Sequence, residues 1–391
     1  GPHSAPDWYV GGTQLEAEYG HAVGSAGDVN GDGYSDIIVG EPMWNGTNTS
    51  EGRAWVYHGS SGGVRQTHAW RVSGSKTNAN YGSAVGTAGD VNGDGYADII
   101  VGAPKWWDDR TDEGKVWVYH GDSGGLRTTS SWSKEGGQNY AHYGSAVGTA
   151  GDVNGDGFAD VIIGVEGWNG DFTDEGRASV YHGSPDGLGP SVAWYGKGGQ
   201  NSVHYGFSVG TAGDVNGDGY ADVIVGAPFY NQVLPFEGKA FLYYGNGQNG
   251  TSLNPRQVRA SLTSTPIARL GWSDWTDAFC IRLSTQNPFG PGRSKLEIDV
   301  KPLGVPFDGT GTVVQTSWLA FPLGSSRVLC ATDVPAGTRY HWRARGRYKP
   351  TTSPFMPLSR WVTMPWNGWN EQDLRTAGSR SLLPMVLHDP E

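Results

Sequence analysis

The stretch that decides the fold is Tyr81–Pro104, which reads Tyr-Gly-Ser-Ala-Val-Gly-Thr-Ala-Gly-Asp-Val-Asn-Gly-Asp-Gly-Tyr-Ala-Asp-Ile-Ile-Val-Gly-Ala-Pro. Its central run, Gly-Asp-Val-Asn-Gly-Asp-Gly followed by an aromatic residue, begins at Gly27, Gly89, Gly151 and Gly213. The four copies are therefore spaced by 62 residues, with no insertion or deletion. A fixed period of this length indicates a tandem array of one supersecondary unit.

Each unit is composed of short segments that favour strands. In the second unit these are the small-residue stretch Ser83–Ala88, then Asp98–Gly102, Lys115–His120 and a short stretch around Trp132. β-Branched and aromatic residues in short segments, with turn residues at every joint, favour strands over helix. Four strands per unit predict the blades of a β-propeller. The sequence thus predicts an all-β chain whose residues 5–258 form a propeller of four 62-residue blades.

The two ends of the repeat bear on closure of the ring. Residues Asp7–Val10 align with the last strand of a unit, whereas Arg256 stands where the fourth unit should have its Trp. The N-terminal strand is therefore expected to complete the fourth blade and close a ring of four. The alternative is that the four units are part of a larger ring.

Each unit carries the pattern Asp-x-Asn-x-Asp-Gly-x-x-Asp, which predicts a cation site. Oxygen side chains at positions 1, 3, 5 and 9, with a backbone carbonyl at position 7, suit a hard cation, and calcium accepts such flexible oxygen ligands better than magnesium does. We expect about four Ca²⁺ ions, one per repeat. The predicted ligands are Asp28, Asn30, Asp32, Tyr34 and Asp36; Asp90, Asn92, Asp94, Tyr96 and Asp98; Asp152, Asn154, Asp156, Phe158 and Asp160; and Asp214, Asn216, Asp218, Tyr220 and Asp222.

These loops differ from a helical EF-hand, because position 12 holds an apolar residue such as Val101 instead of a bidentate Glu. The simpler interpretation is an Asx-rich turn without metal. Three carboxylates within nine residues repel one another unless a cation neutralises them. The net charge of −11 and the twelve loop aspartates agree with a chain that gains positive charge from bound cations.

The segment Tyr81–Pro104 resembles the FG-GAP repeat of integrin α-chain propellers and of bacterial integrin-like proteins. The resemblance extends over roughly residues 8–255. It implies a calcium-bearing β-propeller that acts outside the cell, and hence a secreted or cell-surface protein. Residues Gly1–Ser4 show no signal-peptide pattern, so we expect none in this chain.

After about residue 260 the repeat is lost, and alternating runs such as Lys295–Lys301 predict a β-sandwich at 262–370, followed by a tail at 371–391. The segment Pro335–Arg345 is similar to a turn and strand of fibronectin type III domains, with Tyr340 as the corner tyrosine. That similarity places Cys280 and Cys330 on neighbouring strands, where they form either a disulfide or two buried thiols.

The loops between the second and third strands of the units keep their length and vary in sequence, as binding surfaces often do. Their aromatic residues could stack on sugar rings, which predicts a glycan or an extracellular protein as ligand. The alternative is that these rings cap the blades. The candidate ligand-binding residues are Trp44, Trp106, Trp107, Trp168 and Tyr230.

Other function classes are disfavoured. The run Gly121–Gly125 resembles a serine-protease signature, but the same register in the other units reads as a hairpin turn, so no enzyme is expected. The acidic charge argues against nucleic acid, and no apolar run is long enough for membrane insertion. His58, His120 and His182 recur one residue after a Tyr and are attributed to blade packing. Self-association is a further expectation, and a spacer or protein–protein interaction domain of a larger surface protein is the alternative function.

Overall fold

The computed structural model describes most of the repeat region and parts of the remaining chain. The described residues are 3–156, 158–215, 220–246, 256–261, 263, 265–267, 271–284, 293–303, 305–308, 310–320, 326–349 and 374–376. All regular structure in these ranges is β-strand. Within them, no helix is present that could cross a membrane.

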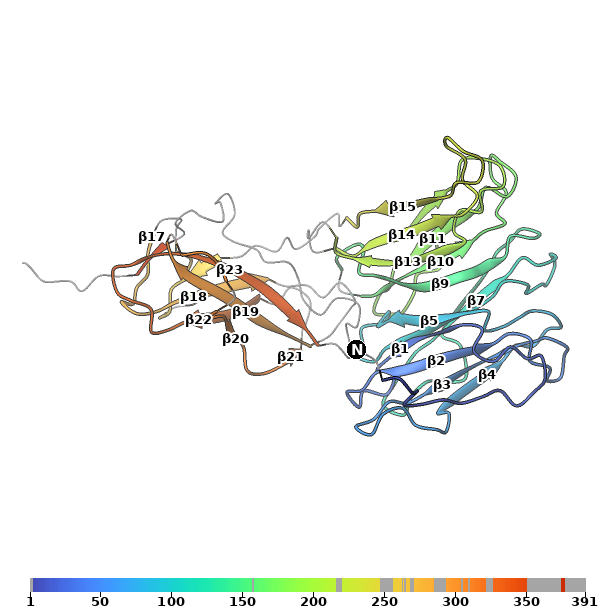
Figure 1. Ribbon diagram of the computed structural model, residues 1–391, viewed down its shortest axis with the longest axis horizontal. Coiled ribbons are helices and arrows are strands. Elements are labelled where there is room, and N and C mark those ends of the chain that lie inside the picture. The colour runs from blue at the N-terminus through green and yellow to red at the C-terminus, as the bar shows by residue number, and fades with distance from the viewer. Residues whose placement is uncertain are drawn as a thin grey trace, which may run out of the picture.

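The first three repeats fold into one four-stranded antiparallel sheet each, and the fourth forms a three-stranded sheet from described residues (Figure 1). The strands of every sheet follow chain order, so each repeat is a simple meander. The strands are β1 (Val23–Gly27), β2 (Asp36–Glu41), β3 (Arg53–Tyr57) and β4 (Trp70–Ser73); β5 (Ala84–Gly89), β6 (Asp98–Ala103), β7 (Lys115–Tyr119) and β8 (Trp132–Glu135); β9 (Tyr143–Gly151), β10 (Asp160–Val165), β11 (Arg177–Tyr181) and β12 (Trp194–Lys197); and β13 (Ser208–Gly213), β14 (Asp222–Ala227) and β15 (Lys239–Tyr243).

Successive sheets pack face to face through apolar residues at the same positions of each repeat. In the joint between repeats two and three, Ile100 and Val118 of one sheet share a buried cluster with Val161 and Ile163 of the next. The outermost strand adds its Trp to the joint: the Trp132 ring lies 5.0 Å from that of Tyr181. Its indole Nε1 donates a hydrogen bond to a carbonyl 57 residues further on, that of Gly189. The joints are thus copies of one another.

The inner strands of neighbouring repeats approach closely because glycine lines the contact. A Cβ at Gly102 would collide with the backbone of Gly144 in the next repeat, and Gly164 meets Gly206 in the same way. Figure 1 shows the four sheets stacked in order, with the first and fourth repeats at opposite ends.

The closed ring of four expected from the sequence is not formed by the described residues. Asp7–Val10 lies on the first repeat, where the Trp8 ring packs 5.2 Å from that of Tyr57, and does not pair with β15. Among the described residues, no strand of the first sheet pairs with a strand of the fourth.

The strands after the repeats, β16 to β24, form a second body of two mainly antiparallel sheets. The buried core of this body contains Phe279, Ile281, Leu296 and Trp342. One sheet has the order β16 (Arg256–Val258), β18 (Phe279–Ser284) and β22 (Ser326–Ala331). The other has the order β17 (Gly271–Trp272), β24 (Leu374–Arg375), β23 (Arg339–Tyr348), β19 (Arg293–Pro302) and β20 (Val313–Val314), with β21 (Leu319–Ala320) also on β19.

Both ends of this body differ from the sequence-based boundaries. Strand β16 pairs with β18, so this body begins by Arg256, inside the range predicted for the propeller. Strand β24 pairs with β23, so Leu374 and Arg375 belong to the sheet and not to a tail. Short pairings between distant segments have no local sequence signal, which explains both errors.

Two predicted features of the second body appear in the structure. Cys280 and Cys330 are joined by a disulfide between the paired strands β18 and β22. The Tyr340 hydroxyl donates a hydrogen bond to the Pro335 carbonyl, 3.2 Å away, as a corner tyrosine does.

Candidate functional site: the aspartate loops and the adjoining pocket

In the first three repeats, the aspartate loop joins the first strand of the sheet to the second, and its described residues fold around its own carboxylates. In the second repeat, Oδ1 of Asp90 accepts hydrogen bonds from the backbone N–H groups of Gly93 (2.7 Å) and Asp94 (3.1 Å), and Oδ2 accepts one from Gly95 (2.8 Å). Oδ1 of Asn92 accepts from Asp94 N, and Oδ1 of Asp94 accepts from Tyr96 N. The oxygens of positions 1, 3 and 5 are therefore all turned back over one tight turn.

The Asp at position 9 connects the loop to the rest of the sheet. In the second repeat, Oδ2 of Asp98 accepts a hydrogen bond from Val91 N at 2.8 Å, and Oδ1 accepts one from Gly121 N at 3.0 Å. Asp36, Asp160 and Asp222 make the equivalent pairs of bonds. A carboxylate oxygen has two lone pairs, so these bonds leave acceptor capacity on each oxygen.

The carboxylates at positions 1 and 9 of the first three loops are buried, which opposes their negative charge, whereas Asp32 and Asp94 at position 5 are exposed. Burial raises the pKa of Asp36 to about 6 and that of Asp90 to about 7. The pKa of Asp98 and of Asp160 is raised well above the usual value, first by burial and then by the neighbouring aspartate at position 1. A bound cation would offset both effects, because it neutralises the charge that burial disfavours.

The recurring histidines contact the loops, a role that the sequence did not predict. Nδ1 of His58 lies 3.1 Å from Nδ2 of Asn30, and Nδ1 of His120 lies 3.2 Å from Nδ2 of Asn92. In the part of the chain that is described, Nε2 of both histidines is buried without a hydrogen-bond partner. Each ring thus holds the amide of the position-3 Asn, so that its Oδ1 faces the loop.

All predicted ligand residues of the first three repeats lie in these loops and are described. The donor set there consists of side-chain oxygens, which fits a hard cation such as calcium. Across the described ranges, however, no group of three or more His, Cys, Asp or Glu side chains is drawn together as in an assembled metal site. In the fourth repeat Asp214, Tyr220 and Asp222 are described, whereas Asn216 and Asp218 lie outside the described residues.

The aromatic residues of the variable loops pack mostly against their own repeats. A basic side chain from the start of the third strand lies over each ring: Arg53 over Trp44, Lys115 over Trp106, Arg177 over Trp168 and Lys239 over Tyr230. Trp106 is only 7 % exposed, which removes it from the predicted ligand surface. Trp107 is 43 % exposed, with its Nε1 bonded to the Thr77 carbonyl.

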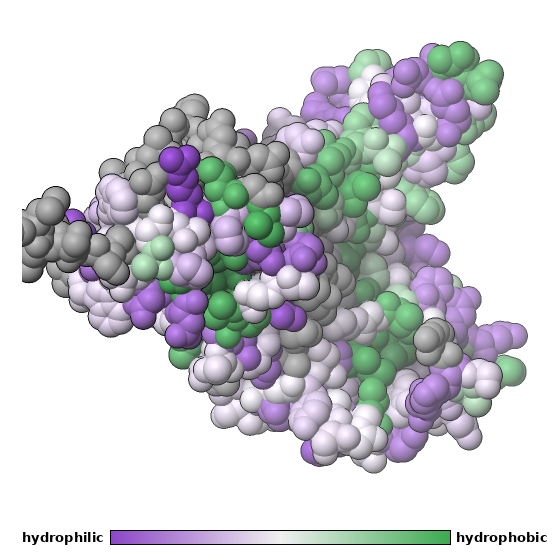
Figure 2. All heavy atoms as spheres, turned by 60° about the vertical axis from the view of Figure 1, so that its left-hand side comes forward, coloured by the Kyte–Doolittle hydropathy of each residue, from purple (hydrophilic) through white to green (hydrophobic). Residues whose placement is uncertain are grey.

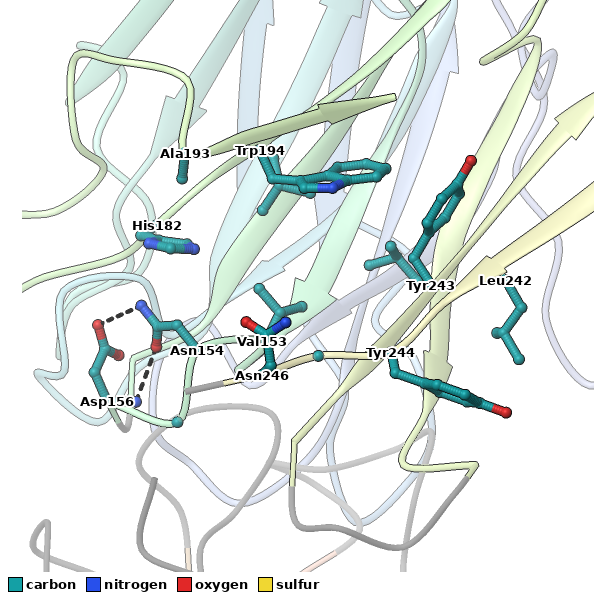
Figure 3. Close-up of a pocket in the computed structure, with 14 residues that line it drawn as sticks. Val153, Asn154, Asp156, His182, Ala193, Trp194, Leu242, Tyr243, Tyr244 and Asn246 are labelled. Carbon is teal, nitrogen blue, oxygen red and sulfur yellow. Dashed lines mark hydrogen bonds between the residues drawn. The ribbon is translucent and has the colours of Figure 1, made fainter. Parts of the chain in front are cut away.

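A pocket of about 950 Å³ lies beside the third aspartate loop, between repeats three and four (Figure 3). Asn154 and Asp156 of the loop and His182 line one side, and Trp194, Tyr243 and Tyr244 line the other. In the preceding joint, Leu188 packs in the same cluster as Trp132 and Tyr181. Position 250, its counterpart in the fourth repeat, is Gly and lies outside the described residues.

Comparison with known proteins accounts for the repeated unit. Residues 19–57, 81–119 and 205–252 match the FG-GAP repeat family, and residues 152–225 match the FG-GAP-like repeat family. In these segments the chain is similar to FG-GAP repeats. The matched segments contain the aspartate loops of all four repeats.

Integrin α chains are among the similar curated proteins. Integrin alpha-4 of Xenopus laevis is 34 % identical over 159 residues, which cover 40 % of this chain and 15 % of that protein. Integrin alpha-5 of Xenopus laevis is 29 % identical over 239 residues, covering 58 % and 21 %. Integrin alpha-V of Gallus gallus is 29 % identical over 254 residues, covering 62 % and 24 %. The chain therefore spans less than a quarter of the length of these relatives.

Among solved structures, a crystal structure of titin domains shares 11 % sequence identity, with a TM-score of 0.19 over 87 % of this chain and 92 % of that one. A likeness this weak carries no argument about the FG-GAP repeats or the second body.

Proposed function

We propose that this chain is an extracellular, calcium-dependent adhesion or ligand-binding module. The observation that carries the proposal is the recurring aspartate loop, whose carboxylates at positions 1 and 9 are buried in the first three repeats, inside segments that match FG-GAP repeats. The similarity to integrin α chains supports a place on the cell surface or outside the cell. The proposal includes a propeller fold for the repeats, a fibronectin-type sandwich for the second body, and a lectin-like activity.

Calcium would be held by Asp90, Asn92 and Asp94 in the second repeat, and by their counterparts in the others. When bound, the cation neutralises the loop carboxylates and locks the turn. The chain's own residues do the rest: Asp98 fastens the loop to the next hairpin, and His120 orients the amide of Asn92.

The pocket beside the third loop supports a glycan as ligand. Aromatic rings at Trp194, Tyr243 and Tyr244 offer apolar faces, and the amides of Asn154 and Asn246 offer hydrogen bonds. This combination suits a sugar ring, which presents an apolar face and a rim of hydroxyl groups. An extracellular protein is the other ligand class that such a surface would accept.

Two measurements test the proposal. A melting temperature that is unchanged when EDTA replaces calcium would contradict the metal assignment, since an ion that binds only the folded chain stabilises it by about 2.7 kcal/mol at a hundredfold excess over its Kd. A glycan-array screen in calcium and in EDTA tests the ligand. Calcium-dependent hits that Tyr244→Ala abolishes support the pocket, and Tyr140→Ala, an exposed tyrosine that does not line it, is the matched control.

A spacer or protein–protein interaction domain is the second candidate function. The observation that favours it is the packing of Trp44, Trp106, Trp168 and Tyr230 under basic residues of their own repeats, which is a structural use of these rings. Under this candidate the array stays blank in both buffers, while calcium still raises the melting temperature.

A further inference from the structure

The sheet face at the end of the fourth repeat is uncovered. Ile224 and Leu242 are 42 % and 43 % exposed, whereas their counterparts Ile100 and Val118 are fully buried against the next repeat. Ala240 is exposed as well, although Ala54 and Ala178 at the same position are buried. This face has the residues of an FG-GAP joint without the sheet that normally covers them. In Figure 2 apolar surface runs along the stack of repeats.

In the part of the chain that the structure describes, the fourth sheet has no outer strand. Strands β4, β8 and β12 pair with the third strand of their repeats, but no described strand pairs with the outer edge of β15. An unpaired edge presents a row of backbone donors and acceptors that can bind another strand. Within the described residues, the fourth repeat is therefore incomplete on one face and on one edge.

The N-terminal segment has the features of such an outer strand, but it lies on the first repeat, at the opposite end of the stack from β15. Nε1 of Trp8 donates a hydrogen bond to the carbonyl of Arg65, 57 residues away, and the Trp8 ring packs on Tyr57. Trp70 makes the same two contacts with Arg127 and Tyr119. Residues 7–10 thus sit on the first repeat as the outer strand of a preceding sheet would.

From these two halves we propose that the chain associates head to tail with a second copy of itself. Residues 7–10 of one copy add to β15 of the other as its fourth strand, and the first repeat covers Ile224 and Leu242. The exposed face of the fourth repeat is one half of a joint, and the first repeat with its N-terminal segment is the other half. Because the two halves lie at opposite ends of the same chain, a second copy of this chain fits the exposed face.

The internal sheets predict the register of this added strand. In the first repeat Val56 pairs with Trp70 and Arg53 pairs with Ser73, and the second and third repeats pair in the same way. We move the third strand of these pairs forward by three repeats, to β15, and the outer strand back by one repeat, to the N-terminal segment. Leu242 then lies opposite Trp8, Phe241 opposite Tyr9, and Lys239 opposite Gly11. The same arithmetic keeps Trp8 on Tyr57 of its own chain, so no existing contact is lost.

Light scattering on the full chain in calcium buffer tests the association. We expect the mass of at least two chains, falling towards one on dilution. Leu242→Arg should lose the association, yet keep the fold, because this side chain is already half in solvent. Leu319→Arg, at a residue 38 % exposed on the second body, should associate as the wild type does. A single-chain mass at every concentration, or normal association of Leu242→Arg, overturns the proposal.

Disulfide trapping tests the register. Chains with Gly11→Cys are mixed with chains carrying Lys239→Cys, and we expect a cross-linked pair between copies. Gly11 has room for the new side chain, since a Cβ there contacts nothing within 4 Å. Ala240→Cys is the matched control, because a shift of one residue turns the side chain to the other face of the strand. Equal cross-linking from positions 239 and 240, or none from either, contradicts the register. In a chain that carries both Gly11→Cys and Lys239→Cys, a cross-link that forms only within one chain would contradict the association and show closure of a ring of four instead.

Discussion

The hydroxyl of Tyr81 donates a hydrogen bond to the hydroxyl of Tyr119, with 2.9 Å between the two oxygens. The same pair recurs at the same distance in the other three repeats, as Tyr19 with Tyr57, Tyr143 with Tyr181 and Tyr205 with Tyr243. Each pair connects the entry to a repeat with its third strand. Polar groups that are buried in this way must keep their partners, which makes the pair sensitive to ionisation.

Alkaline pH should destabilise the repeats through these tyrosines. Burial raises the pKa of Tyr119 from 10.0 to about 12. Because the folded chain holds this proton more tightly, the stabilisation is fully present below pH 10 and is lost as the pH rises to about 12, a difference on the order of 3 kcal/mol. Chemical denaturation at a series of pH values measures this slope. Tyr119→Phe should flatten it, and a slope unchanged by that variant would contradict the assignment.

Gly114→Ala should weaken the joint between repeats two and three. Gly114 has φ +79° and bridges to Tyr143 of the next repeat, and a Cβ would collide with the backbone of Tyr143. Left-handed backbone and steric conflict together should cost at least about 2 kcal/mol of unfolding free energy. The matched variant is Gly148→Ala, at a position where a Cβ meets nothing within 4 Å. Equal melting temperatures for the two variants would disprove this reading of the joint.

The adjacent residues Trp106 and Trp107 should respond differently to truncation. Trp106→Ala removes a ring packed 5.1 Å from that of Trp117 and should cost about 3–5 kcal/mol of stability. Trp107→Ala should leave the melting temperature almost unchanged, since the ring is half in solvent. Thermal unfolding and ligand titration, run side by side on both variants, measure the contrast. A lower melting temperature for Trp107→Ala would contradict this expectation and show that the Trp107 ring stabilises the fold.

Removing the disulfide should affect only the second body. The bond between Cys280 and Cys330 closes a loop with a sequence separation of 50, and such a closure contributes about 4 kcal/mol. The double variant Cys280→Ser, Cys330→Ser should lower the melting transition of the second body and leave that of the FG-GAP repeats in place. Differential scanning calorimetry resolves the two transitions. A shift of the repeat transition would show that the two bodies unfold together.

The sequence predicts the repeats well because each joint depends on residue identities that recur every 62 positions. Trp70, Trp132 and Trp194, spaced by 62 residues, each begin the fourth strand of a repeat, and the described aspartate loops each follow a first strand. The repeat pattern does not show which residues far apart in the sequence contact each other. His120 recurs beside Tyr119, but its contact with Asn92 spans 28 residues and depends on how the third strand returns past the loop.

Closure of the stack could not be predicted for a related reason. The backbones of neighbouring repeats meet closely at Gly102 and Gly144, and no sequence pattern encodes the angle at which the two sheets then pack. The sequence also does not predict which of the candidate aromatic residues are exposed. Trp106 and Trp107 are identical neighbours in sequence, and only the fold buries one ring between Lys115 and Trp117 and leaves the other in solvent.

The indole hydrogen bond that spans 57 residues also constrains how such a gene can change length. A duplication of one whole 62-residue unit reproduces a complete joint, because the new Trp finds a carbonyl at the interval seen for Trp70 and Trp132. A duplication that begins or ends elsewhere in the unit disrupts a joint on each side. Descendants of this array should therefore differ by whole repeats, and length variation within a repeat should be confined to loops that no indole has to cross.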